Sequence, residues 1–240
     1  MSSLPAHIDP IGHAVMDYFK TSKEASIRVL SDIASTDRIP ASYLFRQEND
    51  MPPLETMALS ECRGKILDVG AAAGCHSLIL QGRGADITAL EISGLCCEVM
   101  QKLGIENVLC DDFYHQKENH YDTLLMMMNG IGLAGTLEGL GKLLIKSRHL
   151  LRAGGQIIFD SSDIEYLYVE EDGSRWINLN SRYYGELTYT LQYKKITGKP
   201  FPWLFIDPKT LGSLARKGGF SLEVIAWGDH YDYLGILRKK

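Results

Sequence analysis

Asp68 and the small residues that follow it form the part of the sequence with the clearest chemical potential. Asp68 lies within the short apolar run Ile66–Val69, and Gly70-Ala71-Ala72-Ala73-Gly74 follows directly. Because these residues carry little or no side chain, a ligand can lie against the backbone of such a turn, and a helix starting after it offers free N–H groups. The carboxylate of Asp68 adds a negative charge beside the turn, where a cationic group of a ligand could bind.

The elements that must position this turn follow the pattern of a parallel α/β fold. Apolar runs predict strands at 65–70, 85–93, 105–113, 121–130 and 153–163, and helices are predicted between them at 75–84, 95–104 and 137–151. Strands that alternate with helices at this spacing predict βαβ units and a mainly parallel sheet. A helix at 207–220 and two closely joined strands at 221–229 and 231–239 follow, and the short link between these strands predicts an antiparallel pair.

Residues 1–63 precede this pattern and are expected to form an N-terminal helical cap that contributes to substrate binding. Asp9 and Pro10 are typical of a helix start, because the carboxylate caps free N–H groups and proline fits the first turn. A second helix is predicted near residues 51–60. The run Ala25–Leu30 is compatible with either a helix or a strand.

The remaining domain, residues 64–240, contains a segment that breaks the alternation of strands and helices. Residues 182–195 alternate as an antiparallel strand does, and Thr197-Gly198-Lys199-Pro200 predicts a turn before the apolar run 201–207. An inserted β-hairpin is therefore expected at about residues 175–206. The fold class predicted for the whole chain is α/β, with a Rossmann-like, mainly parallel seven-stranded sheet, helices on both faces and an antiparallel C-terminal strand.

The run Asp68-x-Gly70-x-x-x-Gly74 resembles the first motif of the class I S-adenosylmethionine (SAM) methyltransferases, with Ala72 in place of the middle glycine. A dinucleotide-binding turn requires G-x-G-x-x-G. Here Ala72 and Cys75 stand where that fingerprint needs its second and third glycines, so a pyrophosphate would meet a methyl group and a thiol. The resemblance therefore favours SAM over a nicotinamide cofactor.

Three later positions support the same resemblance. Glu91 follows the turn by about twenty residues at the end of the second strand, where a carboxylate can bind a ribose diol of either NAD or SAM. Asp112-Phe113 resembles the acid and apolar pair that binds adenine in this family, with Asp111 as a competing carboxylate. Asn129 stands where these enzymes place residues facing the transferred methyl group.

The resemblance implies a set of residues for each ligand. The expected cofactor-binding residues are Arg46, Asp68, Gly70, Ala71, Ala72, Gly74, His76, Glu91, Ile92, Asp112, Phe113, Met128 and Asn129. The candidates for the acceptor pocket are Tyr43, Asn129, Asp160, Tyr184 and Trp203. Arg46 is expected to pair with the SAM carboxylate, or to form a local salt bridge. His76 either contacts the amino-acid end of SAM or is simply a polar residue at a helix start.

The implied reaction is methyl transfer to an unidentified, small-molecule acceptor by in-line displacement. Such a step depends on positioning and exclusion of water, and a general base is needed only when the acceptor atom carries a proton. No catalytic residue is therefore predicted. The alternatives are a methyltransferase acting on protein or RNA, a nicotinamide-dependent oxidoreductase, an aminopropyl-transferring relative, and a protein that binds SAM without catalysis.

Composition limits the partners and the compartment. The net charge of −5 argues against nucleic-acid binding, which relies on excess Lys and Arg. The five cysteines contain no C-x-x-C pair, so neither a disulfide framework nor a metal site is expected. No apolar run approaches the length of a membrane span, and a cytoplasmic location is expected. The inserted hairpin could cap the pocket, cover the sheet or join two subunits in a homodimer.

Overall fold

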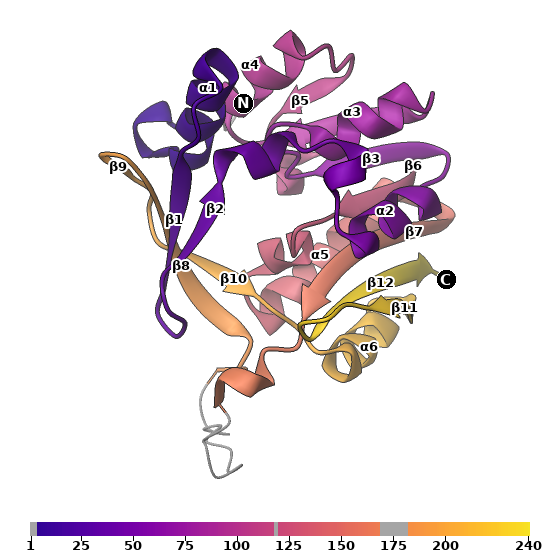
Figure 1. Cartoon of the computed structure of the whole chain (residues 1–240). Coiled ribbons are helices and arrows are strands. Elements are labelled where there is room, and N and C mark those ends of the chain that lie inside the picture. Colours follow the sequence, from indigo (N-terminus) through magenta and orange to yellow (C-terminus); the bar gives the residue numbers. More distant parts are fainter. Residues whose placement is uncertain (1–3, 118–119, 169–181) are drawn as a thin grey trace.

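The computed structural model describes residues 4–117, 120–168 and 182–240, and these form two β-sheets (Figure 1). The larger sheet has seven strands, β3 (Lys65–Val69), β4 (Asp86–Glu91), β5 (Val108–Cys110), β6 (Tyr121–Met126), β7 (Leu151–Ser162), β11 (Phe220–Trp227) and β12 (Asp232–Lys239). Their spatial order is β11-β12-β7-β6-β3-β4-β5. Strands β3 to β7 run parallel, whereas β12 is antiparallel to both β7 and β11. The predicted Rossmann-like sheet is confirmed.

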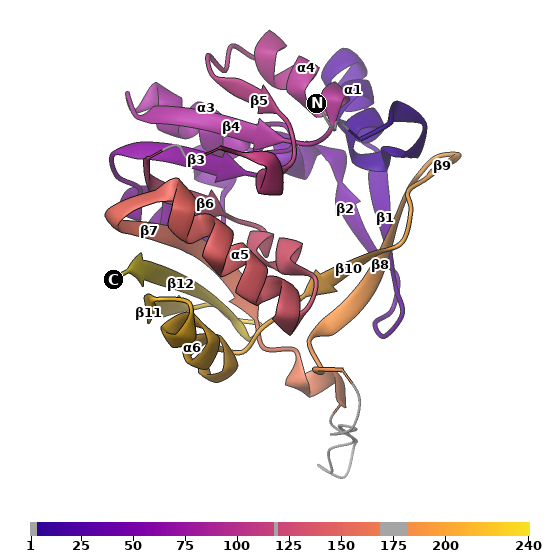
Figure 2. The same cartoon turned by 180° about the vertical axis from the view of Figure 1, so that it is seen from behind.

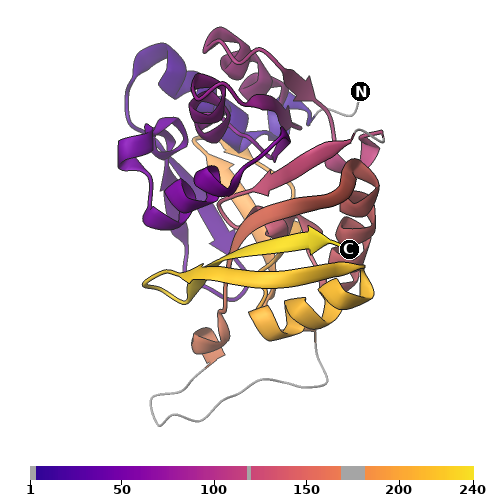
Figure 3. The same ribbon diagram turned by 90° about the vertical axis from the view of Figure 1, so that its right-hand side faces the viewer.

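Helices cover both faces of this sheet (Figure 3). One face is covered by α5 (Leu137–Leu150) and α6 (Pro208–Lys217), and the other by α2 (Pro53–Glu61), α3 (Cys75–Gly82) and α4 (Gly94–Lys102). Side chains alternate along each strand, so that Leu67 packs under α5 while its neighbour Ile66 packs under α2 and α3. Burial on both faces explains why these strands read as almost continuous apolar runs.

A second, smaller sheet lies across the carboxyl ends of the parallel strands, and Figures 1 and 2 both show it there. Its five strands are β1 (Ser26–Ser31), β2 (Asp37–Pro40), β8 (Glu186–Tyr193), β9 (Ile196–Thr197) and β10 (Phe201–Leu204). Strand β8 is antiparallel to β1 at one edge and to β10 at the other. The N-terminal segment and the inserted segment therefore build one sheet together.

This second sheet corrects the description of residues 1–63 as a helical cap. The segment does contain α1 (Pro10–Thr21) and α2, but β1 and β2 lie between them. The undecided run Ala25–Leu30 falls largely within β1. It pairs with the nearby β2 on one side and, on the other, with β8, which is more than a hundred residues away in the sequence. The second pairing is absent from the local pattern.

The inserted segment also departs from the prediction in detail. The chain reverses at Lys194-Lys195, between β8 and β9, where Lys194 has a φ of 52°. The predicted turn at Thr197–Pro200 instead carries the chain from β9 to β10. The part of the predicted hairpin at 175–181 lies outside the described residues.

Short 3-10 helices connect several of these elements. They are η1 (Ala6–Ile8), η2 (Ala41–Phe45), η3 (Glu48–Asp50), η4 (Phe113–His115), η5 (Gly130–Ala134) and η6 (Glu165–Tyr168). The predicted start of α1 is confirmed, because the Asp9 carboxylate accepts the N–H of Gly12 at 2.8 Å and Pro10 is the first helical residue. The chain just before α1 lies against the end of β4, where Leu4 donates its N–H to the carbonyl of Ile92 at 2.9 Å.

Candidate cofactor and acceptor site

The turn after β3 combines an open side with a tightly packed end. Gly70 and Gly74 have φ values of +76° and +83°, in the left-handed region that favours glycine. A Cβ at Gly70 would meet no atom within 4 Å, whereas one at Gly74 would lie 2.3 Å from the Ile105 side chain. The backbone at Gly70 is therefore accessible to a ligand, and Gly74 permits close packing of the chain behind the turn.

Ala72, which replaces the middle glycine of the motif, keeps the left-handed conformation with a φ of 50°. This conformation costs an L-residue roughly 1–2 kcal/mol. Ala72→Gly is therefore expected to raise the free energy of unfolding by up to ~1 kcal/mol, with the SAM dissociation constant unchanged. Denaturant unfolding measures the first quantity and calorimetric titration the second.

The neighbouring Ala73 provides a matched control for this substitution. Ala73 is buried and is not among the residues with positive φ. Ala73→Gly should therefore lower the free energy of unfolding by roughly 0.5–1 kcal/mol. Equal destabilisation by both substitutions would contradict the strain assigned to position 72.

Asp68 lies at the end of β3 with its side chain buried and facing the turn. Its carboxylate accepts a hydrogen bond from the hydroxyl of Ser77, at 2.7 Å, and the residue is 2% exposed. Burial raises the pKa of Asp68, while the charge of His76 and the hydrogen bonds from Ser77 act in the opposite direction. Helix α3 thus holds the carboxylate in place through its first turn.

Glu91 fastens the turn to the end of β4. Its two carboxylate oxygens accept the backbone N–H groups of Ala72 and Ser93, each at 2.9 Å. Burial raises the pKa of Glu91, and the hydrogen bonds from Ser93 and Ala72 oppose that shift. Ile92 follows with 37% of its surface exposed, beside the N-terminal segment that binds its carbonyl.

The predicted adenine-binding pair follows β5. The carboxylate of Asp112 caps η4 by accepting the N–H of Tyr114 at 2.7 Å, and the ring of Phe113 is buried in the core. The competing Asp111 accepts the N–H of Asp112 at 2.8 Å and lies 3.6 Å from His115. Both carboxylates are thus held by short-range contacts at the carboxyl edge of the sheet.

A buried cluster of charged residues beside α3 was only partly predicted. Arg46 donates to Glu55, His76 Nε2 lies 2.8 Å from a carboxylate oxygen of Glu55, and the Tyr43 hydroxyl donates to the other oxygen at 3.3 Å. The guanidinium carbon of Arg46 lies 3.9 Å from the centre of the Tyr43 ring. Glu55 joins these groups, and sequence reasoning missed it. A charged residue between Leu54 and the apolar end of α2 was the available signal.

Opposite charges stabilise one another within this cluster. Burial by itself raises the pKa of Glu55, but His76 and Arg46 lower it overall. Burial lowers the pKa of His76, yet hydrogen bonds with Cys75 and Glu55 and the charge of Asp68 raise it to about 10. At neutral pH the cluster therefore contains a carboxylate between two cations.

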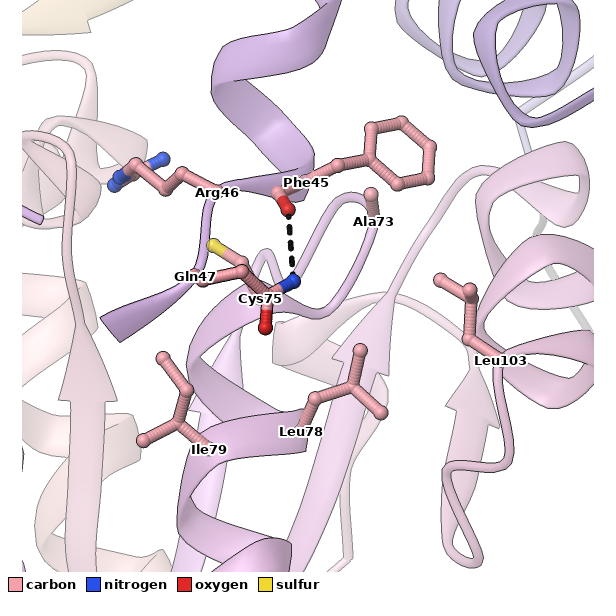
Figure 4. A pocket seen from close by; sticks show the side chains of 8 residues that line it. All are labelled: Phe45, Arg46, Gln47, Ala73, Cys75, Leu78, Ile79 and Leu103. Carbon is pink, nitrogen blue, oxygen red and sulfur yellow. Dashed lines mark hydrogen bonds between the residues drawn. The ribbon is translucent and has the colours of Figure 1, made fainter. Parts of the chain in front are cut away.

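One hydrogen-bond donor of the Arg46 guanidinium, Nε, has no partner among the described residues. The side chain of Arg46 is 4% exposed. Figure 4 shows Arg46 beside a small pocket of about 70 Å³, with its guanidinium extending away from Phe45. Cys75 and Leu78 of α3 line the same pocket. The carboxylate of a ligand beside Arg46 would accept a hydrogen bond from this Nε–H group.

A larger cavity of about 360 Å³ lies between the turn and the second sheet. Strand β3, the turn and α3 contribute Asp68, Gly70, Ala71, Ala72 and His76. The end of β6 contributes Met127, Met128, Asn129 and Gly130. The second sheet contributes Ile27, Val29, Asp37, Ile39, Tyr189, Leu191, Phe201 and Trp203. One continuous space therefore connects the motif residues with the strands that the sequence did not fully predict.

Asn129 and Trp203 are the acceptor-pocket candidates that line this cavity. The Asn129 side chain donates to the carbonyl of Leu204 at 3.1 Å and accepts from the Ser161 hydroxyl at 2.9 Å. It therefore ties β10 to β7. Met128 and Asn129 have φ values of 59° and 55°, and such backbone strain is frequent at functional sites.

The other three candidates do not line the cavity. Tyr43 is engaged with Glu55, and the Tyr184 hydroxyl donates to Asp163 at 2.8 Å. Asp160 accepts the backbone N–H of Asn129 at 2.9 Å, and burial raises its pKa to about 7. Each of the three therefore has a polar contact within the protein, and their place in an acceptor pocket stays a prediction.

Comparison with known proteins identifies the family of this chain. No family model and no curated protein matches the chain. A SAM-dependent methyltransferase from Bacteroides fragilis, solved in complex with S-adenosyl-L-homocysteine (SAH), is 43% identical, covers 98% of this chain and 97% of its own, and has a TM-score of 0.92.

Two more distant structures share the fold. The 1,6-didemethyltoxoflavin-N1-methyltransferase of Burkholderia thailandensis is 15% identical over 80% of this chain and 79% of its own, with a TM-score of 0.52. The sugar N-methyltransferase KedS8 of Streptoalloteichus is 15% identical over 78% and 85%, with a TM-score of 0.53.

The chain belongs to the class I SAM-dependent methyltransferase superfamily. It is a SAM-dependent methyltransferase, and its cofactor is SAM. The site fits this cofactor, because the backbone at Gly70 is open, Asp68 and Glu91 offer carboxylates, and Arg46 retains a buried donor.

In the described ranges, none of the helices combines the length and apolar character of a membrane span. The same residues contain no group of three or more His, Cys, Asp or Glu side chains that could hold a metal ion.

Proposed function

We propose that this enzyme transfers the methyl group of SAM to a small molecule held between the two sheets. One observation carries this proposal: the cavity extends from Gly70 and Ala72 to Trp203 on the second sheet, so cofactor and acceptor can share one continuous space. The cavity is lined mainly by apolar and aromatic side chains, as small-molecule sites usually are. The names of KedS8 and the toxoflavin enzyme, which describe small-molecule methylation, also support it.

On the cofactor side, the backbone of Gly70, Ala71, Ala72 and Gly74 would lie against the amino-acid part of SAM. Asp68 would bind the cationic amino group of that part, since its carboxylate is buried beside the turn.

The end of β4 and the loop after β5 would hold the nucleoside part of SAM. Glu91 would accept the ribose hydroxyls with lone pairs not used by the backbone, and Ile92 would border the sugar. Asp112 and the backbone of Phe113 would bind the adenine.

SAM supplies a methyl group on a positively charged sulfur, so the protein has mainly to bind, orient and exclude water. Met128 and Asn129 would face the methyl group from the end of β6, and Trp203 would close the other side. Gly132 leaves room for Trp203 in this position, because a Cβ there would lie 2.5 Å from the indole nitrogen. Asn129 would keep β10 in place through its bond to Leu204.

Arg46 and His76 would bind the carboxylate end of SAM. Arg46→Ala is expected to raise the SAM dissociation constant at least ~10-fold, because a charge-assisted hydrogen bond contributes roughly 1.5–3 kcal/mol. Calorimetric titration with SAM measures this change. Arg83→Ala, which breaks a surface ion pair with Glu48, serves as the control and should leave the constant unchanged. A folded Arg46→Ala protein with wild-type affinity would end this assignment.

The proposed function is tested by following a labelled methyl group. Purified enzyme is incubated with methyl-labelled SAM and a cell extract, and the label is measured in the dialysable and retained fractions. Label in the dialysable fraction, in a compound other than SAM and its breakdown products, supports a small acceptor. Label confined to protein or RNA would overturn it. Thermal-shift titration with SAM, SAH, NAD and NADP tests the choice of cofactor in parallel. A ligand that binds only the folded state raises the unfolding temperature of the protein.

A further inference from the structure

The second sheet separates its charged side chains by face. Ile27 and Val29 on β1 and Ile39 on β2 line the cavity. Arg28 lies between the first two on β1 and is directly opposite Arg38 of β2 in the strand register. Because successive side chains alternate across a strand, both arginines lie on the outer face. The basic residues of β1 and β2 are thereby kept away from the cavity.

Asp37 is the exception to the apolar character of the inner face. It lines the cavity and is directly opposite Val29 in the register of β1 and β2. One carboxylate oxygen accepts the N–H of Arg38 at 2.7 Å. Among the described residues that line the cavity, the other charged side chains are Asp68 and His76, both at the cofactor end, and none is Lys or Arg.

Aromatic rings form the part of this wall that β8 and β10 of the same sheet supply. Phe201 meets Trp203 edge-on, with ring centres 5.9 Å apart, and Tyr189 meets Phe201 edge-on at 6.3 Å. Burial and the charge of Asp37 raise the pKa of Tyr189 to about 12, so its hydroxyl stays protonated at neutral pH. This wall offers ring-sized apolar surfaces close to a single carboxylate.

We propose that the acceptor is a small, ring-containing, apolar molecule that carries a protonated amine, and that Asp37 recognises this amine. This inference rests on the proposed function and specifies its substrate class. An apolar body suits the aliphatic and aromatic lining, and the amine has one partner of opposite charge there. A phosphorylated or carboxylated acceptor would find no Lys or Arg on the lining, where the one cation, His76, lies at the cofactor end, and it would be repelled by Asp37.

The test uses the SAH-saturated enzyme and three probes, phenethylamine, phenylacetate and glucosamine, with binding measured by calorimetry. Phenethylamine is expected to bind roughly tenfold tighter than phenylacetate, because attraction and repulsion at a solvent-accessible carboxylate each change affinity by up to about fivefold. It should also bind tighter than glucosamine, which carries the same charge on a polar body. In Asp37→Asn, the preference for the amine should fall to about twofold.

Asp86→Asn provides the matched control, since Asp86 is an exposed residue at the start of β4 and its loss changes the net charge equally. It should leave the preference intact. Equal or tighter binding of phenylacetate, tighter binding of glucosamine, or an unchanged preference in Asp37→Asn would each overturn the inference. If SAH binds but no probe does, the substrate class is wrong while the proposed function stands. If SAH itself fails to bind, the proposed function fails first.

Discussion

Glu55→Ala is expected to lower the free energy of unfolding by about 3–5 kcal/mol, the largest effect on stability that we predict. Glu55 is the carboxylate shared by Arg46 and His76, and its side chain is 7% exposed. Its removal leaves two cations buried together without a counter-charge. Denaturant unfolding at neutral pH measures the loss.

Two further variants make this prediction specific. Glu61→Ala, at the exposed end of the same helix, should change the free energy of unfolding by no more than ~0.5 kcal/mol. Glu55→Gln preserves the shape but removes the charge, and an intermediate loss is expected. If Glu55→Ala is no less stable than Glu61→Ala, the cluster contributes no net stability and its electrostatic description is wrong.

Glu91→Ala is expected to raise the SAH dissociation constant by about 100-fold. The substitution removes the two charge-assisted hydrogen bonds expected to the ribose, each contributing roughly 1.5–3 kcal/mol. It also releases the N–H groups of Ala72 and Ser93, so the turn loses its attachment to β4. Calorimetric titration with SAH gives the constant, and circular dichroism verifies that the variant is folded.

Glu106→Ala is the control for this second prediction. Glu106 is exposed in the turn before β5, and its replacement should change the SAH constant by less than about twofold. Wild-type affinity in a folded Glu91→Ala protein would show that the ribose is bound elsewhere. The proposed cofactor pose would then have to be abandoned.

The large sheet could be predicted because each of its strands and helices has a recognisable pattern in the nearby sequence. Apolar runs at β3, β4 and β6 are separated by helices with clear ends, and the short link between β11 and β12 indicates an antiparallel pair. The second sheet could not be predicted in the same way. Strand β1 pairs with β2 nearby in the sequence, but its pairing with β8, which builds the sheet, joins residues more than a hundred positions apart and is absent from any local window.

The residues of the candidate site show the same difference between local and long-range signals. Residues of the turn and of the strand ends were found because their spacing follows the chain. Glu55 and Asp37 were missed, because the roles argued for them depend on segments that approach only after folding: α2 brings Glu55 to His76, and the second sheet places the exposed Asp37 on the side that borders the cavity. Possible dimer formation through the inserted segment stays a prediction.

The pairing of β1 with β8 has a consequence for synthesis on the ribosome. Val29 emerges from the exit tunnel long before its partner Leu191 has been translated. Most of the parallel strands are complete by then, and domains generally fold as their residues emerge. The nascent chain should therefore acquire its nucleoside-binding half first, while β1 has β2 as its one strand partner until the later segment is made. A stalled or truncated chain ending before β8 would bury the first half yet leave Ile27 and Val29 open to chaperones or to aggregation.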